Sequence, residues 1–233
     1  MWPACAAGLA LLAIAADALA QFSGTAGVVS DYRYRGVSLS GNDPAAQAGV
    51  NYDDASGWYA GAFASTARSP IDGRHGVQAI FSTGYATRLP SGLSLEMGAD
   101  YSVLTAVSGH DYAEVFAGFA FRELSGRLYY SPRYFGRDSK AVYAEANFAH
   151  PLQDNVRVLA HAGALRADAD VHQGYVYRGP TGPQFDAAAG IAVDWQGFNV
   201  QLTWVQVNHV GGAYAFDAAS RRRGVVLSVS HSF

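Results

Sequence analysis

Charged side chains recur at every second residue in several parts of this sequence. Asp31, Arg33 and Arg35 alternate with tyrosines, and Glu96 and Asp100 share one side of another alternating run. Guanidinium groups form bidentate hydrogen bonds with carboxylates, so the arginine pair is suited to bind an anionic solute or to pair with neighbouring acids. Charges gathered on one face of a strand indicate an electrostatic role, either orienting a solute or forming a salt-bridged network.

No catalytic or metal-binding motif accompanies these charges. The sequence contains no His-x-x-x-His pair, no phosphate-binding glycine loop ahead of a helix and no calcium loop. His161 falls on the charged side of a run, without an evident Ser, Asp or Asn constellation around it in the sequence. The net charge of −3 and the scattered arginines also exclude a nucleic-acid partner. We therefore expect neither an enzyme nor a cofactor.

The composition indicates β-strands that must position these charges. Half of the 233 residues are hydrophobic while only 15% are charged, and no linker-like tract divides the chain, which favours one domain. The 26 glycines, 14 tyrosines and 12 phenylalanines against two methionines are typical of strands with aromatic borders rather than of packed helices. We predict an all-β protein.

The N-terminal segment 1–20 has the features of a signal peptide. An apolar run from Ala4 ends in Ala18-Leu19-Ala20, with small residues at the positions required for cleavage, so the mature chain is expected to start at Gln21. Cys5 is the only cysteine, which leaves the mature chain without a thiol. No later stretch approaches the roughly 18 to 20 apolar residues of a spanning helix, so strands would have to cross a membrane.

Alternation of apolar and polar residues continues along most of residues 21–233. Leu95, Met97 and Tyr101 lie on the parity opposite to Glu96 and Asp100, as expected when one strand face meets lipid and the other water. We predict a transmembrane antiparallel up-and-down β-barrel of roughly twelve strands, with ten as the alternative. The expected strands are 22–37, 44–54, 57–67, 76–88, 92–105, 111–123, 126–135, 140–149, 155–166, 183–195, 198–208 and 222–233.

The predicted connections alternate between tight turns and longer polar loops, the longest at 166–182 and 208–221. In outer-membrane barrels the short turns face the periplasm and the long loops face outward. The terminal Phe233 ends an alternating strand, which is expected to be recognised by the barrel-insertion machinery through its open edge. Arg221, Arg222 and Arg223 either bind lipopolysaccharide phosphates or form a solvated run of charges.

The parity of each predicted strand assigns residues to two faces. Aromatic residues near strand ends are expected to form interfacial girdles or to pack across strands: Tyr32, Tyr34, Trp58, Tyr85, Tyr101, Tyr130, Tyr134, Trp195 and Phe198. The residues expected to line the interior are Asp31, Arg33, Arg35, Glu96, Asp100, Glu114, Arg122, Arg127, Arg133, Glu145 and Arg157. Their opposite charges nearly cancel.

The N-terminal third resembles the TorF-like porin family. The resemblance rests on three runs, VSDYRYRGVS at 29–38, GNDPAAQAGVNY at 41–52 and SGWYAGAFAS at 56–65, and is only a general pattern afterwards. It implies a Gram-negative outer-membrane barrel with an undefined substrate. Three functions stay open: a narrow pore for passive passage of small hydrophilic solutes or ions, an occluded structural barrel, and a surface protein that binds partners through its loops.

Overall fold

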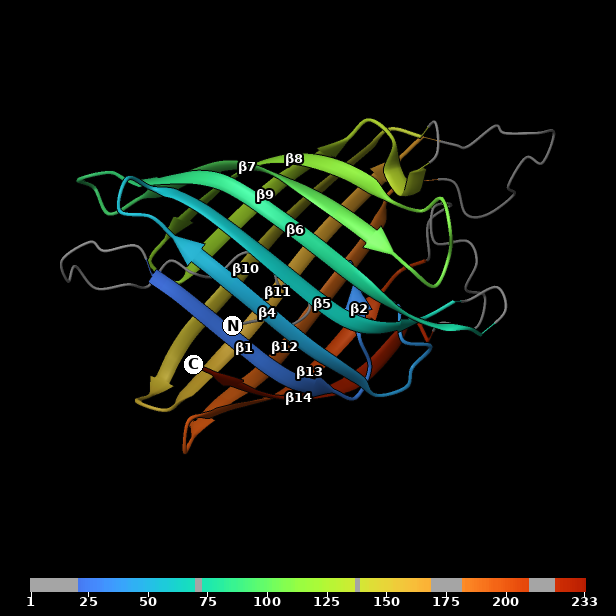
Figure 1. Ribbon diagram of the computed structural model, residues 1–233. Coiled ribbons are helices and arrows are strands. Elements are labelled where there is room, and N and C mark those ends of the chain that lie inside the picture. Colours follow the sequence, from blue (N-terminus) through green and yellow to red (C-terminus); the bar gives the residue numbers. More distant parts are fainter. Residues whose placement is uncertain (1–20, 70–72, 137–138, 169–181, 210–220) are drawn as a thin grey trace.

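The computed structural model describes residues 21–69, 73–136, 139–168, 182–209 and 221–233 (Figure 1). The expected signal peptide and most of the loops expected at 166–182 and 208–221 lie outside these residues. Among the residues described, no helix is long and apolar enough to cross a membrane.

Twelve antiparallel strands close into one barrel, which confirms the predicted fold. Each strand pairs with its neighbours in the chain, as an up-and-down barrel requires, and Figure 1 shows the strands tilted across the barrel. The strands are β1 (Gln21–Val29), β4 (Ala45–Asp53), β5 (Trp58–Arg68), β6 (His75–Arg88), β7 (Ser94–Leu104), β8 (Tyr112–Phe121), β9 (Leu124–Ser131), β10 (Ala141–Gln153), β11 (Val156–Ala167), β12 (Gln184–Trp195), β13 (Phe198–Val207) and β14 (Arg223–Ser232).

The first and last strands seal the barrel. Thr25 lies opposite Ser232, and the register continues to Val29 opposite Ser228. Phe233 extends the seam, because its backbone N–H donates to the Gly24 carbonyl at 3.0 Å and its carbonyl accepts from the Gly24 N–H at 2.8 Å. Closure leaves no sheet edge with unpaired backbone groups.

The predicted two-face pattern holds around the barrel. Leu95, Leu202 and Val225 point outward with 41%, 56% and 63% of their surface exposed, whereas Gln201 and Ser228 on the inward parity are 2% and 5% exposed. Six of the aromatic residues expected in girdles are also outward and exposed: Trp58, Tyr85, Tyr101, Tyr130, Trp195 and Phe198. The outward parity is therefore mainly apolar, and the inward parity carries most of the polar and charged side chains of the strands.

Short turns and longer connections alternate, as predicted. The short turns join β4 to β5, β6 to β7, β8 to β9, β10 to β11 and β12 to β13, and they define the end that we call the turn end. Gln196 and Gly197 form a two-residue turn with φ values of 49° and 83°, the geometry that matches strand twist in tight hairpins. The longer connections gather at the opposite end, which we call the loop end.

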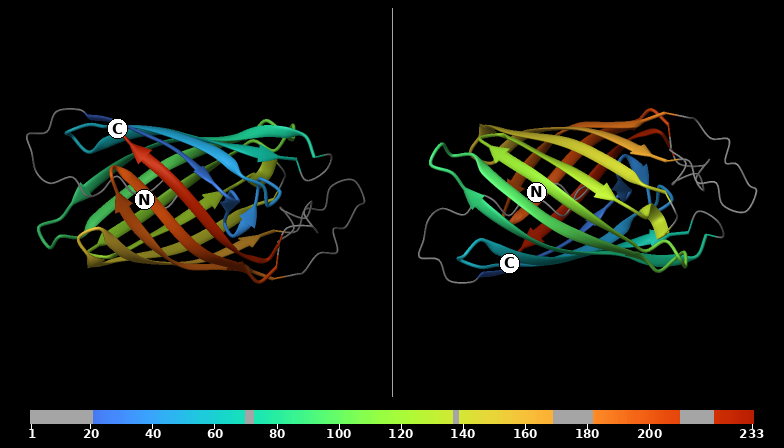
Figure 2. Two further views of the ribbon diagram at one scale, coloured as in Figure 1. Left: turned by 90° about the horizontal axis from the view of Figure 1, so that it is seen from below. Right: turned by 90° about the horizontal axis from the view of Figure 1, so that it is seen from above.

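Three predicted strand ends are off by four or more residues: 135 for Ser131, 149 for Gln153, and 37 for Val29. The last of these changes the interior. The strand expected over 22–37 ends at Val29, and the chain then turns into the barrel as a small hairpin of β2 (Arg33–Tyr34) and β3 (Val37–Ser38). Both views in Figure 2 show this hairpin within the outline of the barrel, near the loop end. Tyr32 and Tyr134, expected in the girdles, are buried inside at 2% and 0% exposure, and Tyr34 packs against the same core.

Candidate functional site: the barrel interior and its inserted hairpin

The inserted hairpin is held in shape by a tight turn and by one carboxylate. Arg35 and Gly36 at its tip have φ values of 51° and 80°, as in a two-residue turn of the type common in β-hairpins. At its base, Asp31 accepts hydrogen bonds from Arg33 Nε at 2.7 Å and from Ser38 Oγ at 2.6 Å. Asp31 and Arg33 are 8% and 3% exposed, so this ion pair is internal to the hairpin and largely removed from solvent.

The hairpin is anchored to separate parts of the barrel wall. Tyr32 donates its hydroxyl to Gln78 Oε1 on β6 at 2.7 Å, and Gln184 Nε2 on β12 donates to the Arg35 carbonyl at 2.9 Å. A Cβ built on Gly36 would lie 2.6 Å from Asp186 Cβ, so only glycine fits the tip against β12. The hairpin therefore crosses the interior between opposite parts of the wall.

A buried ion pair on β8 holds the tip of the hairpin. Arg35 donates Nη2 to Glu114 Oε2 at 2.6 Å and Nη1 to Glu114 Oε1 at 3.0 Å, and both side chains are 3% exposed. The guanidinium also lies 4.4 to 5.4 Å from the ring centres of four tyrosines, which are Tyr34, Tyr129, Tyr134 and Tyr143. Aromatic faces attract cations, so these rings add to the stabilisation of a charge held away from water.

Two further polar clusters line the wall. Arg127 on β9 pairs with Glu96 on β7, with Nε to Oε1 at 2.5 Å and Nη2 to Oε2 at 2.8 Å. On the adjoining strands β10 to β12, His161 Nε2 lies 2.9 Å from Asp186 Oδ1, and His161 Nδ1 lies 2.7 Å from Asn147 Oδ1. The described residues contain no group of three or more His, Cys, Asp or Glu side chains able to hold a metal ion.

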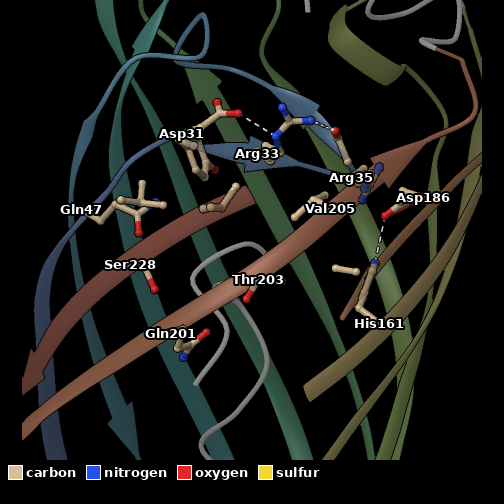
Figure 3. Close-up of a pocket in the computed structure, with 15 residues that line it drawn as sticks. Asp31, Arg33, Arg35, Gln47, His161, Asp186, Gln201, Thr203, Val205 and Ser228 are labelled. Atoms are coloured by element: carbon tan, nitrogen blue, oxygen red, sulfur yellow. Dashed lines mark hydrogen bonds and ion pairs between the residues drawn. The ribbon is translucent and has the colours of Figure 1, made fainter. Parts of the chain in front are cut away.

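A cavity lies beside the hairpin, as Figure 3 shows. It contains about 580 Å³ of space unoccupied by atoms, part of it open to solvent. Arg33, Arg35 and Asp31 face it from the hairpin, and His161 and Asp186 from β11 and β12. The remaining polar lining comes from β4, β13 and β14 and is uncharged: Gln47, Gln201, Thr203 and Ser228.

Comparison with known proteins places the chain in a family and a fold. The sequence profile of Gcw_chp, a bacterial protein family of unknown function, matches residues 13–233. The chain belongs to this family. NanC porin is similar in structure, with a TM-score of 0.57 and 9% identity over 91% of this chain and 99% of NanC. KdgM porin, solved in complex with disordered oligogalacturonate, has a TM-score of 0.54 and 10% identity over 92% of this chain and 99% of KdgM.

These comparisons support a porin-like barrel for this Gcw_chp member at the level of fold. No curated protein matches the sequence. Identities near 10% carry no residue-by-residue correspondence, so the chemistry of the interior has to be argued from this chain itself. The assignment to the TorF-like family stays a prediction.

The structure brings most of the predicted interior residues together. Asp31, Arg33 and Arg35 lie inside, although on the hairpin rather than on a wall strand. Five more charged residues occupy the inward parity of β7 to β10: Glu96, Asp100, Glu114, Arg127 and Glu145. Arg157 also shares the inward parity but lies near the turn end, where it pairs with Asp194 at 3.0 Å. Their proposed role in lining a pore stays a prediction.

Two predicted interior residues do not lie on the wall. Arg122 occupies the turn between β8 and β9 with a φ of 53° and lies exposed, its guanidinium 5.2 Å from the Phe121 ring centre. Arg133 is exposed beyond Ser131, where β9 ends. Pro132 has no N–H for the strand ladder, and a short helical turn at Tyr134–Gly136 follows it, so alternation no longer determines direction there.

Asp186 and the partners of His161 were missed as a site. Asn147 lies directly opposite His161 in the β10–β11 register, and Asp186 lies opposite Gly163 two residues further along β11. His161 therefore has Asn and Asp partners, although no such constellation is evident in the sequence. Parity already placed Asp186 inward, but strand register, which brings the three side chains together, is not visible in one sequence.

Proposed function

We propose that this chain is an outer-membrane porin-like channel of a Gram-negative bacterium, exported by a cleaved signal peptide at 1–20 and non-enzymatic. Small hydrophilic solutes or ions would pass through its interior without an energy source. One observation carries the proposal: a closed barrel presents apolar side chains outward on every strand and surrounds a polar interior that retains unfilled space. Polar interiors with unfilled space are typical of barrels that conduct.

The hairpin is proposed as the narrowest part of this channel. Tyr32, Arg33, Arg35 and Val37 are each at most 3% exposed, so the hairpin fills the section that it occupies. With twelve strands the barrel is well below the 16 to 18 strands of wide aqueous porins. A low conductance is therefore expected.

The same burial favours a second candidate function, an occluded barrel that serves a structural or surface-binding role in the outer membrane. In that case the docked hairpin closes the interior permanently. The two functions differ in one measurable property, which is whether the barrel conducts while the hairpin is docked.

Planar-bilayer recording of residues 21–233 tests both candidates. The wild type is compared with a variant in which residues 31–40 are replaced by a Gly-Ser linker of equal length, and with a Ser91→Gly variant in an exposed turn as the control. Steps of constant size in the wild type and larger steps in the linker variant support the narrow channel. A silent wild type with a conducting linker variant supports the occluded barrel. Silence of both, with insertion verified by protease protection, contradicts the channel.

A further inference from the structure

Five adjacent strands of the twelve-stranded wall present almost no charge to the interior. The five adjacent strands β13, β14, β1, β4 and β5 carry only one charged residue on their inward parity, Asp53 at the turn end. The same strands present amide and hydroxyl side chains inward: Gln21, Ser23, Thr25, Gln47, Asn51, Ser65, Asn199, Gln201, Thr203, Ser228, Ser230 and Ser232. Charged residues on the inward parity are otherwise confined to β6 to β12, so the interior has a neutral polar side and a charged side.

The cavity opens against this neutral side, where it has unused hydrogen-bonding groups. Thr203 on β13 and Ser228 on β14 are 6% and 5% exposed, and neither hydroxyl has a hydrogen-bond partner among the described residues. Gln47, which also lines the cavity, donates its Nε2 to Ser65 Oγ at 3.3 Å, and its Oε1 accepts no hydrogen bond from the residues that the structure describes. These groups line the cavity without a protein partner, so a ligand or water that enters it can complete their hydrogen bonds.

The charged groups at the cavity all have side-chain partners. Arg33 is paired with Asp31, Arg35 with Glu114, and Asp186 with His161. The two arginines are thus matched by two carboxylates, and no surplus positive charge remains for an anionic ligand. Val29, Val205 and Val226 complete the lining with apolar surface, which suits the C–H faces of a sugar ring.

We propose that this cavity is a binding site for a small neutral polyhydroxylated solute, that is, a sugar or a polyol. Its hydroxyl groups would exchange hydrogen bonds with Thr203, Ser228 and Gln47 while its C–H groups contact the valines. The proposal rests on the proposed function, since the solute is expected to reach the cavity through the barrel interior. It deepens that function by naming the solute class and the side of the wall that recognises it.

Binding to the refolded chain in detergent micelles tests the site without requiring conduction. Saturation-transfer NMR is measured with glucose, glucuronate and glucosamine, which share one ring and differ in charge. We expect glucose to bind more tightly than glucuronate. Thr203→Val and Ser228→Ala should each weaken glucose binding about two- to tenfold, the loss of about one hydrogen bond. Thr87→Val, on the exposed outward parity of β6, is the matched control and should change nothing.

Three results would overturn the site: tighter binding of glucuronate or glucosamine than of glucose, no saturation transfer from the protein to glucose, or glucose binding that both cavity variants leave unchanged. The conductance recordings distinguish failure of the proposed sugar site from failure of the proposed channel. A conducting barrel without glucose binding refutes the site and leaves the channel intact, whereas a silent barrel that binds glucose supports the site and contradicts the channel.

Discussion

Removing Arg35 should release the hairpin and destabilise the interior more than removing its partner Glu114. In Arg35→Met, the Glu114 carboxylate, which is 3% exposed with the hairpin docked, loses its partner, and it lies directly opposite Asp100, which is 7% exposed, in the β7–β8 register. Breaking a buried ion pair by removing one partner costs about 3 to 5 kcal/mol, and like charges facing each other across strands add to the cost. We expect Arg35→Met to lie at the upper end of that range.

Glu114→Gln should cost less, because the remaining guanidinium keeps other partners. Arg35 still donates to Tyr134 Oη at 3.1 Å and still lies within 5.4 Å of the four tyrosine ring centres. Cation–π contacts are worth about 0.5 to 2 kcal/mol, which offsets part of the lost pairing. The double variant Arg35→Met with Glu114→Leu removes both charges together and should recover most of the stability lost in either single variant.

Two readouts separate a loosened hairpin from a destabilised barrel. Urea unfolding in detergent, followed by fluorescence of the outward tryptophans Trp58, Trp195 and Trp204, gives the free energy of unfolding of the barrel. Trypsin cleavage after Arg33, which is 3% exposed in the docked hairpin, reports its release. If both single variants unfold within about 1 kcal/mol of wild type and keep Arg33 protected, or if the double variant shows the sum of the single losses, the ion pair does not hold the hairpin.

Two other predictions concern the faces and ends of the barrel. Leu95 and Leu202 are outward residues that are 41% and 56% exposed. Leu95→Arg and Leu202→Arg should each lower the free energy of unfolding in lipid vesicles by about 2 to 4 kcal/mol if these residues face the bilayer centre, whereas Ser91→Arg in a turn should leave it unchanged. Unchanged stability of both leucine variants would contradict the assigned lipid face. An epitope inserted at 172–178, outside the described residues, should be labelled from outside intact cells, whereas an epitope inserted at 91–92 should not be labelled. Reversed labelling would exclude the proposed orientation.

Strand positions were predictable because alternation is a local property of a strand. Most predicted boundaries agree with the structure within two residues, including 198–208 for Phe198–Val207 and 155–166 for Val156–Ala167. Each strand must bury one parity and expose the other whatever its neighbours are, so one sequence is enough to reveal it. Ion-pair partners depend on strand register and on contacts between distant segments. Neither register nor such contacts can be predicted from the alternation in one sequence.

The hairpin shows where the local pattern misleads. Residues 29–38 continue the alternation of β1, with Asp31, Arg33 and Arg35 opposite Tyr32 and Tyr34, and so they were assigned to one long strand. The predicted strand 22–37 is longer than the roughly 9 to 11 residues that a membrane strand needs, and this excess length indicates that part of it has another structure. Gly36, at the position where φ becomes 80°, was the second sign of a turn.

The inward fold also explains why the interior charges had to be paired. A wall strand could leave Arg33 and Arg35 facing water, whereas a hairpin packed on several sides removes them from it, and each then needs a carboxylate at hydrogen-bonding distance. Asp31 and Glu114 meet that need at 2.7 and 2.6 Å. The arginines that alone would favour anions are thereby used to hold the hairpin. What remains free to meet a solute is the uncharged side of the wall, and for this reason solute recognition is assigned to Thr203 and Ser228 rather than to the more conspicuous arginines.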